Sequence, residues 1–291
     1  MEIFKAKNIG FCFGVKRAIN KANQLLKETT NDNIYMLGEI IHNPQVIIEF
    51  ESKGVHIVQD VSQVPFHKYL ITRAHGISHH ERQLAKKRDI KLIDTTCPYV
   101  KKLHQITDLL RKENYQIIIF GDTNHPEIKS LLSYNNVNAK VFQSINDIKD
   151  YSFSDKSKIG LISQTTKDKE EFKQIISKIF ENLEELRIFN TICKATSLRQ
   201  NSTRKLAKKV DLMIVVGGLN SANTTRLAQL SKKIGVDTYH IETAQEIKKT
   251  WFKKKNKIGI TSGASTPDYI TESVINRIKK IFQMNQYISY L

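Results

Sequence analysis

Short apolar runs alternate with longer stretches of helical periodicity along the whole chain. Between residues 15 and 26 the apolar positions recur at spacings of three, four and seven, which predicts a helix over about 14–27. Compact apolar runs such as 117–120 and 212–216 predict buried strands instead. Because strands that alternate with helices are typical of parallel α/β units, the pattern predicts an α/β fold with parallel sheets.

This alternation runs through the chain three times. The predicted strands span residues 2–6, 34–37, 54–58, 69–72, 90–94, 116–120, 140–142, 158–162, 186–189, 212–216, 238–241 and 257–261. The predicted helices span residues 14–27, 45–52, 79–88, 98–114, 126–134, 224–234 and 267–282. Two more helices are predicted to end near residues 181 and 209, capped by the segment 163–166 and by Thr196 or Ser197.

The three cysteines of the chain, Cys12, Cys97 and Cys193, each lie between a predicted strand and the helix that follows it. Ligands of parallel α/β sheets bind at the carboxyl ends of the strands, so three such edges facing one axis would bring the cysteines together. No linker separates the repeats. The predicted units are 14–96, 97–193 and 194–282, the last completed by the N-terminal segment 1–13, with 283–291 as an extended tail.

Composition adds little to the prediction of the fold class, but it indicates the cellular compartment and the state of the cysteines. The 291 residues are 40% hydrophobic and 26% charged, as in ordinary globular proteins. No apolar run approaches the roughly 20 residues of a membrane span, and the N-terminus lacks a signal-peptide core, so we expect a cytoplasmic protein. Three cysteines there do not suggest a disulfide framework. The cysteines could simply be buried thiols that pack as small hydrophobic side chains. Their Gly, Pro and Thr neighbours place them at element boundaries and favour a binding role instead.

The formal net charge of +17 comes mainly from lysines spread along the chain. We favour a solvated lysine-rich surface as its explanation. Nucleic-acid binding is the alternative, although neither zinc-finger spacing nor an RNA-recognition signature is present. Attraction of acidic partners or anionic substrates is a third interpretation.

Polar side chains gather at the predicted strand ends. Four of the five prolines open a helix there, and helix N-termini favour anions. His42, His75 and His125 lie at these ends, where they could bind an anion, move protons or hold a metal. Glu127 is a candidate proton donor, or simply a first-turn acid that the helix dipole favours. The cysteines lack the tight pairs of structural zinc sites, and iron–sulfur clusters usually take four thiolates.

An ordered set of motifs resembles the 4-hydroxy-3-methylbut-2-enyl diphosphate reductase (IspH, LytB) family from Met1 to about Phe282. The matching segments are Gly10-Phe11-Cys12-Phe13-Gly14-Val15, Ile41-His42-Asn43-Pro44, Ala74-His75-Gly76, Asp94-Thr95-Thr96-Cys97-Pro98, His125-Pro126-Glu127, Gln164-Thr165-Thr166, Cys193-Lys194-Ala195-Thr196, Asn220-Ser221-Ala222-Asn223 and Gly263-Ala264-Ser265-Thr266-Pro267-Asp268. The resemblance implies a pseudo-threefold trefoil of α/β units around a central 4Fe–4S cluster. It also implies the last step of the methylerythritol phosphate route to isoprenoids, the reductive dehydroxylation of an allylic diphosphate to isopentenyl and dimethylallyl diphosphate.

The resemblance also assigns roles to residues. Cys12, Cys97 and Cys193 would ligate the cluster, whose fourth iron would be open to the substrate hydroxyl. Glu127, Thr165 and His125 would be catalytic, with Glu127 supplying protons and Thr165 placing the hydroxyl network. The substrate-binding residues would be His42, His75, His125, Thr165, Ser221, Ala222, Asn223 and Ser265.

Ala222 departs from the family, which usually has a second serine at this position. One phosphate hydrogen bond should then be missing, or be made by a backbone N–H or by Thr224, and we expect weaker substrate binding. The family implies ferredoxin or flavodoxin as an acidic electron donor, which gives the +17 charge a use in docking. We expect a monomer or weak dimer without nucleic acid or membrane. A nucleic-acid-binding protein and a phosphate-binding protein without redox chemistry stay as alternatives.

Overall fold

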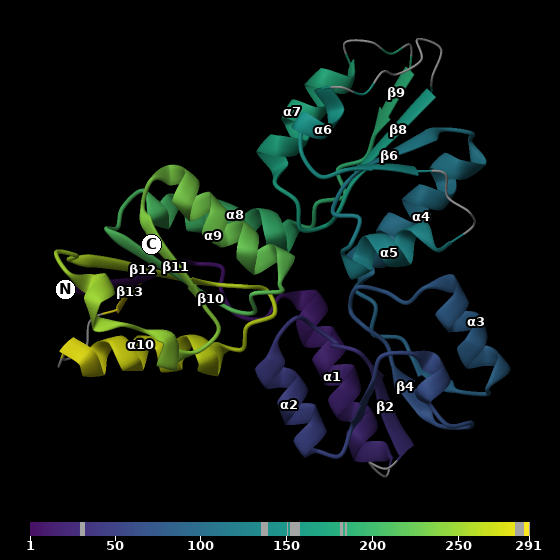
Figure 1. Cartoon of the computed structure of the whole chain (residues 1–291), viewed down its shortest axis with the longest axis horizontal. Coiled ribbons are helices and arrows are strands. Elements are labelled where there is room, and N and C mark those ends of the chain that lie inside the picture. Colours follow the sequence, from purple (N-terminus) through teal and green to yellow (C-terminus); the bar gives the residue numbers. More distant parts are fainter. Residues whose placement is uncertain are drawn as a thin grey trace. The chain divides into compact units, whose positions relative to one another are not determined.

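The structure is a computed structural model that describes residues 1–29, 33–134, 139–149, 151, 158–180, 183, 185–282 and 288–290. Figure 1 labels its α-helices and most of its strands. By their internal contacts the described residues form two compact units. Unit 1 comprises 1–15, 42–44 and 194–291, and unit 2 comprises 16–41 and 45–193. The three-part boundaries expected from the sequence stay a prediction, and 283–287 and 291 of the expected tail lie outside the described residues.

Three parallel sheets repeat one strand order, β3-β2-β4-β5, β7-β6-β8-β9 and β11-β10-β12-β1, with β13 added beyond β1 in the last sheet. This confirms the predicted α/β class of three similar units with small parallel sheets. The strands are β1 (Glu2–Lys5), β2 (Ile34–Leu37), β3 (His56–Val58), β4 (Tyr69–Ile71), β5 (Lys91–Ile93), β6 (Gln116–Phe120), β7 (Ala139–Phe142), β8 (Lys158–Ser163), β9 (Glu185–Ile188), β10 (Leu212–Val216), β11 (Asp237–Ile241), β12 (Lys257–Ser262) and β13 (Ile288–Tyr290).

The helices are α1 (Phe13–Glu28), α2 (Pro44–Ser52), α3 (His79–Lys87), α4 (Pro98–Lys112), α5 (Pro126–Leu132), α6 (Asn146–Lys149), α7 (Lys169–Phe180), α8 (Lys194–Ala207), α9 (Ala222–Ile234) and α10 (Asp268–Phe282), with 3₁₀ turns η2 (Val61–Gln63), η3 (Ala244–Glu246) and η4 (Lys249–Phe252). Two predicted helix starts were wrong. Helix α8 begins directly after Cys193, not at Thr196 or Ser197. Helix α7 begins at Lys169, because Asp168 accepts the free N–H groups of its first turn while the Thr165 hydroxyl is bonded elsewhere.

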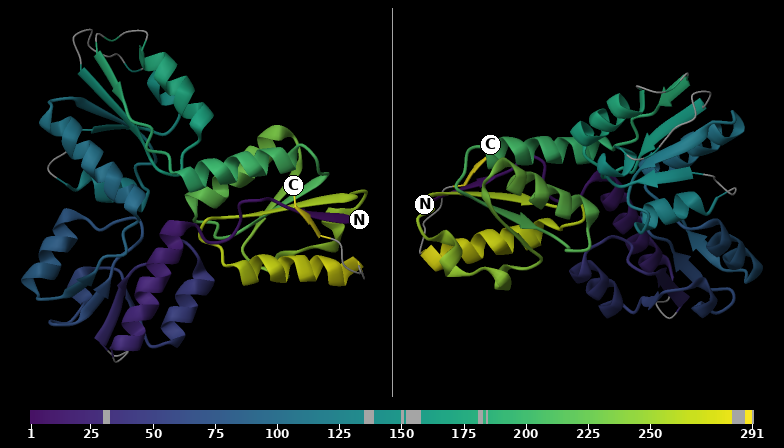
Figure 2. Two further views of the ribbon diagram at one scale, coloured as in Figure 1. Left: turned by 180° about the vertical axis from the view of Figure 1, so that it is seen from behind. Right: turned by 45° about the horizontal axis from the view of Figure 1, so that its top comes forward.

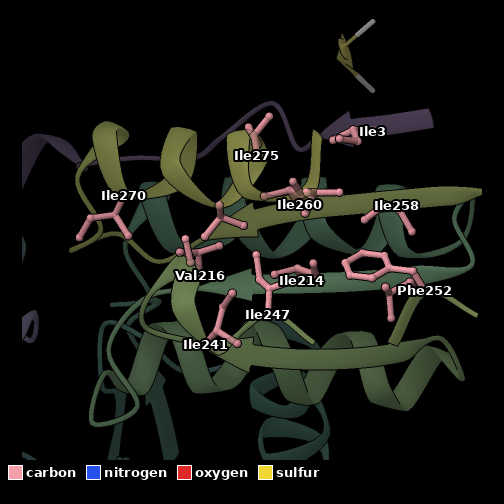
Figure 3. Packing of buried hydrophobic residues seen from close by; sticks show 14 residues of the cluster. Ile3, Ile214, Val216, Ile241, Ile247, Phe252, Ile258, Ile260, Ile270 and Ile275 are labelled. Atoms are coloured by element: carbon pink, nitrogen blue, oxygen red, sulfur yellow. The ribbon is translucent and has the colours of Figure 1, made fainter. Parts of the chain in front are cut away.

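In unit 1 the sheet lies between α10 on one face and α8 with α9 on the other, as Figures 1 and 2 show. Strand β10 alternates between the two faces because successive strand side chains point to opposite sides. Ile214 and Val216 join the α10 core drawn in Figure 3, whereas Met213 packs with the α8 side. A Cβ on Gly259 would lie 2.5 Å from the Met213 sulfur, so the close approach there requires glycine.

The second sheet of unit 2 follows the same rule. Ile118 and Phe120 of β6 face α7, and Ile117 and Ile119 face α4 and α5. Gly160 of β8 faces α4, where a Cβ would lie 2.6 Å from the Leu110 side chain. Strand β8 reads Lys-Ile-Gly-Leu-Ile-Ser and β12 reads Lys-Ile-Gly-Ile-Thr-Ser, so the repeat of structure is also a local repeat of sequence. Among the described residues, no helix is both long enough and apolar enough to span a membrane.

Candidate active site

Each cysteine lies directly before a helix, Cys12 before α1, Cys97 before α4 and Cys193 before α8. Their backbone N–H groups make equivalent hydrogen bonds to the loop that follows the neighbouring strand of the same sheet. Cys12 donates to the Ala264 carbonyl at 3.1 Å, Cys97 to the Ala74 carbonyl at 2.9 Å and Cys193 to the Thr165 carbonyl at 3.0 Å. The three positions are therefore topologically equivalent, and all three thiols are half-buried and outside any disulfide.

The loop before Cys12 is held by Gly10, whose φ of +73° favours glycine. Its N–H donates to the Ser262 hydroxyl at 3.0 Å, and its carbonyl accepts from Arg199 of α8. A Cβ on Gly10 would lie 2.0 Å from an Asp268 carboxylate oxygen. Side chains from α8, β12 and α10 thus fix the turn that presents Cys12.

Glu127, in the first turn of α5, is 1% exposed and both of its carboxylate oxygens are bound by Thr165. The Thr165 N–H donates to one oxygen at 2.8 Å and the Thr165 hydroxyl to the other at 2.6 Å. Burial raises the pKa of Glu127 to about 6, against the opposing effect of the two hydrogen bonds. A carboxyl with this pKa can give up a proton near neutral pH.

His75 and His125 meet in the same unit, with ring centroids 5.4 Å apart in an edge-to-face arrangement. His125 precedes α5, and its Nδ1 accepts the Glu127 N–H at 3.2 Å. Since Nδ1 accepts a hydrogen bond, the neutral ring carries its proton on Nε2. An Nε2–H group is a donor of the kind that binds phosphate oxygens.

The segment 42–44 belongs to unit 1, where the Ser265 hydroxyl donates to the His42 carbonyl at 2.9 Å. A Cβ on Gly218 would lie 2.8 Å from the same carbonyl oxygen, so the backbone of the loop that follows β10 approaches His42 closely. His42 and Ser265 are thus neighbours through the main chain.

Ser221 caps α9 by accepting the Thr224 N–H at 3.4 Å and the Thr224 hydroxyl at 3.0 Å. The Thr224 side chain is fully buried and its hydroxyl proton is already donated to Ser221. Thr224 therefore does not take the place of the serine that the family usually has at position 222. Asn223 is 5% exposed, and neither side-chain amide atom has a hydrogen-bond partner among the described residues. A buried amide without a partner is costly, which points to a ligand that completes it.

The predicted site residues fall into two groups. Unit 2 holds Cys97, Cys193, His75, His125, Glu127 and Thr165, and unit 1 holds Cys12, His42, Ser221, Ala222, Asn223 and Ser265. Sequence reasoning missed Arg17, Arg199 and Asp268, which contact the cysteine loops. Only Asp268 had a signal, because it ends a motif quoted for the resemblance.

A cavity of about 390 Å³ in unit 2 lies between α3, α4 and α5 and contains none of the predicted site residues. Its charged groups are paired, Asp94 with Lys101 at 2.7 Å and Asp108 with Arg111 at 2.9 Å. The Lys101 ion pair and hydrogen bonds from Thr96 lower the pKa of Asp94 to about 2 despite the opposing effect of burial. Burial and the nearby Arg82 lower the pKa of His104 to about 4. We assign no ligand to this cavity.

The sequence profile of the family described as LytB protein matches residues 3–279. A 4-hydroxy-3-methylbut-2-enyl diphosphate reductase from Aquifex aeolicus is 42% identical over 284 residues, which cover 97% of each chain. The protein of that name from Helicobacter pylori is 44% identical over 282 residues, covering 97% of this chain and 100% of the relative.

Two solved structures are similar over nearly the whole chain. E-1-hydroxy-2-methyl-but-2-enyl-4-diphosphate reductase from Plasmodium falciparum has a TM-score of 0.93 at 31% identity, covering 100% of this chain and 92% of its own. An (E)-4-hydroxy-3-methyl-but-2-enyl diphosphate reductase, described as the terminal enzyme of the non-mevalonate pathway, has a TM-score of 0.68 at 41% identity. It covers 96% of this chain and 100% of its own. The segment matched by the family profile includes all three cysteine-bearing loops.

Proposed function

Since the chain belongs to the LytB protein family, we propose that it reduces (E)-4-hydroxy-3-methylbut-2-enyl diphosphate to isopentenyl and dimethylallyl diphosphate. This reaction would be the last step of the methylerythritol phosphate route to isoprenoids. It removes the allylic hydroxyl as water and takes up two electrons and two protons. A redox group, an anion site and a proton donor are therefore required.

The redox group in this proposal is a 4Fe–4S cluster held by Cys12, Cys97 and Cys193. The donor set fits, because three half-buried thiols occupy equivalent places before α1, α4 and α8. Helix N-termini favour negative charge, and a cluster ligand is a thiolate. When bound, a cluster with three thiolates supplies electrons one at a time and leaves one iron open to the substrate hydroxyl.

The anion site would bind the substrate diphosphate. Asn223 supports this role, since both atoms of its buried amide lack a described partner and its N–H₂ can donate to a phosphate oxygen. His42, His75 and His125 would donate ring N–H groups and Ser221 its hydroxyl, and the Ser265 hydroxyl would have to exchange the His42 carbonyl for a phosphate oxygen in order to donate. Ala222 offers only a backbone N–H in the first turn of α9, so one hydrogen bond to phosphate should be lost.

Glu127 would protonate the departing hydroxyl and, after taking up a second proton from solvent, the allylic carbon. The contacts of Thr165 are the main support for this role, because this one residue contacts both the proposed acid and a proposed cluster ligand. Its N–H and hydroxyl bind Glu127, and its carbonyl accepts the Cys193 N–H at 3.0 Å. Proton donor and redox group would therefore share one rigid support, and the raised pKa of about 6 would leave part of the buried carboxyl protonated near neutral pH, ready to donate as the hydroxyl leaves.

The electron donor, the cytoplasmic location and the monomeric or weakly dimeric state remain part of this proposal. A ferredoxin or flavodoxin is acidic, and a net charge of +17 would favour its encounter with the chain. Nucleic-acid binding stays the competing explanation of that charge.

The decisive experiment is anaerobic purification followed by turnover of the diphosphate substrate with dithionite and a dye mediator. We expect a brown protein with about four iron and four sulfide per chain. Cys12→Ser should abolish turnover. A colourless protein that binds nucleic acid with steep salt dependence would refute the proposal, and turnover that survives Cys12→Ser would refute the role of the cluster.

A further inference from the structure

Two cations of α1 bind the loop that ends at Cys97. Arg17 Nη1 donates to the Thr96 carbonyl at 3.1 Å, and Lys21 Nζ donates to the Asp94 carbonyl at 3.0 Å. They lie four residues apart, one helical turn, so both side chains leave the same face of α1. Thr96 directly precedes Cys97 and is buried. All of these residues belong to unit 2.

These cations keep their charge uncompensated in the described part of the chain, where no carboxylate lies within ion-pair distance of Arg17 or Lys21. The carboxylate of Asp94, whose main-chain carbonyl accepts from Lys21, is bound instead by Lys101 at 2.7 Å. A neutral amide could donate to a carbonyl equally well, so hydrogen bonding alone does not require two cations here. Both side chains are half-buried, where charge is screened less than at the surface.

The loop before Cys12 shows a parallel arrangement within unit 1. Arg199, which is 4% exposed, donates to the carbonyl of Gly10, two residues before Cys12. Cationic donors thus bind main-chain carbonyls just before two of the three cysteines. Cluster potentials depend on net charge and on hydrogen bonding around the thiolates.

We infer that Arg17 and Lys21 are positioning residues that hold the Cys97 loop and place positive charge beside the cluster, which favours its reduced, more negative state. This rests on the proposed function. One electron adds one negative charge, and a half-buried cation near it stabilises that state more than the oxidised one. The cations would thereby ease electron entry from a weakly reducing donor.

The test is an anaerobic redox titration of the cluster-loaded full chain, followed by electron paramagnetic resonance. Arg17→Gln keeps a donor but removes the charge, and should lower the equilibrium constant for one-electron reduction about tenfold, or about 59 mV. Arg17→Lys should keep most of the wild-type value. Lys16→Gln is the matched control, because Lys16 is exposed on the same helix, and should change the constant less than twofold.

An Arg17→Gln potential equal to the wild-type value would overturn the inference, and so would an equal shift in Lys16→Gln, which would mean a general charge effect. If Arg17→Gln fails to retain iron, the same titration is made on Lys21→Gln. Its reduction potential should fall below the wild-type value by a smaller amount, and an unchanged potential would overturn the inference. A wild-type chain without iron and sulfide would instead refute the proposed function. The two failures are therefore distinguishable.

Discussion

Replacing Glu127 by glutamine should make the protein more stable at pH 8 and less active. The change keeps the size of the side chain and removes its titratable group. Glu127 is 1% exposed, and its two oxygens accept hydrogen bonds from Thr165 at 2.8 and 2.6 Å. A glutamine can accept the Thr165 N–H and donate to the Thr165 hydroxyl, so the local network can persist.

The magnitude follows from the raised pKa of Glu127. Folding raises it from 4.5 to about 6, so the folded protein binds this proton more tightly than the unfolded chain. The contribution is fully present below pH 4.5 and is lost as pH rises through about 6. At roughly 1.4 kcal/mol per pH unit, the wild-type protein loses about 2 kcal/mol across this window, and Glu127→Gln does not.

The assay is urea unfolding of the iron-free chain at pH 4.5 and pH 8, followed by far-ultraviolet circular dichroism. The free energy of unfolding of Glu127→Gln, relative to wild type, should be about 2 kcal/mol higher at pH 8 than at pH 4.5. Glu51→Gln is the matched control, since Glu51 is an exposed glutamate of the same unit. That control should show no such change with pH.

Activity should move in the opposite direction. Loss of a general acid typically costs about 10²- to 10⁴-fold in turnover, which we expect for the iron-loaded Glu127→Gln variant. A variant that loses more stability at pH 8 than at pH 4.5 would show that the carboxylate, not the acid, is the favoured buried form, and an equal effect at both pH values would show that folding does not raise the pKa of Glu127. Wild-type turnover in that variant would show that Glu127 is not the proton donor.

Four further outcomes are expected. Activity (kcat/KM) should fall as pH rises above about 6, and Thr165→Val, which removes a hydrogen bond that lowers the pKa of Glu127, should move this limb to higher pH. Ala222→Ser should lower KM by about 2- to 10-fold at unchanged kcat, as one added hydrogen bond permits; unchanged KM would contradict the missing phosphate contact. Cys193→Ser should lose iron without loss of circular dichroism, because the backbone bond to Thr165 persists. Gly10→Ala should lower the free energy of unfolding by about 1–2 kcal/mol, because alanine is strained at a φ of +73°, and should reduce the iron bound per chain. Full iron loading of this variant would show that the turn at Gly10 is not needed for cluster binding.

Periodicity determined most of the fold. The alternation of apolar residues in β6 and the three-four spacing in α1 are local properties, so the strands and helices were predicted close to their observed bounds. The short helix α6 and the 3₁₀ turns had too few residues to show a period. The family motifs likewise pointed to the predicted site residues, since a motif is a local string.

Tertiary structure decided what each of those residues contacts. The Thr165 segment was expected to cap the next helix, but the Thr165 hydroxyl bonds Glu127, which lies 38 positions away in the chain. Asp168 therefore takes over the cap of α7. The contacts of Arg17 with Thr96 and of Asp268 with Gly10 likewise join distant segments. No local pattern encodes such pairs, because they depend on how strands and helices pack, and this packing is also what buries Glu127 and raises its pKa.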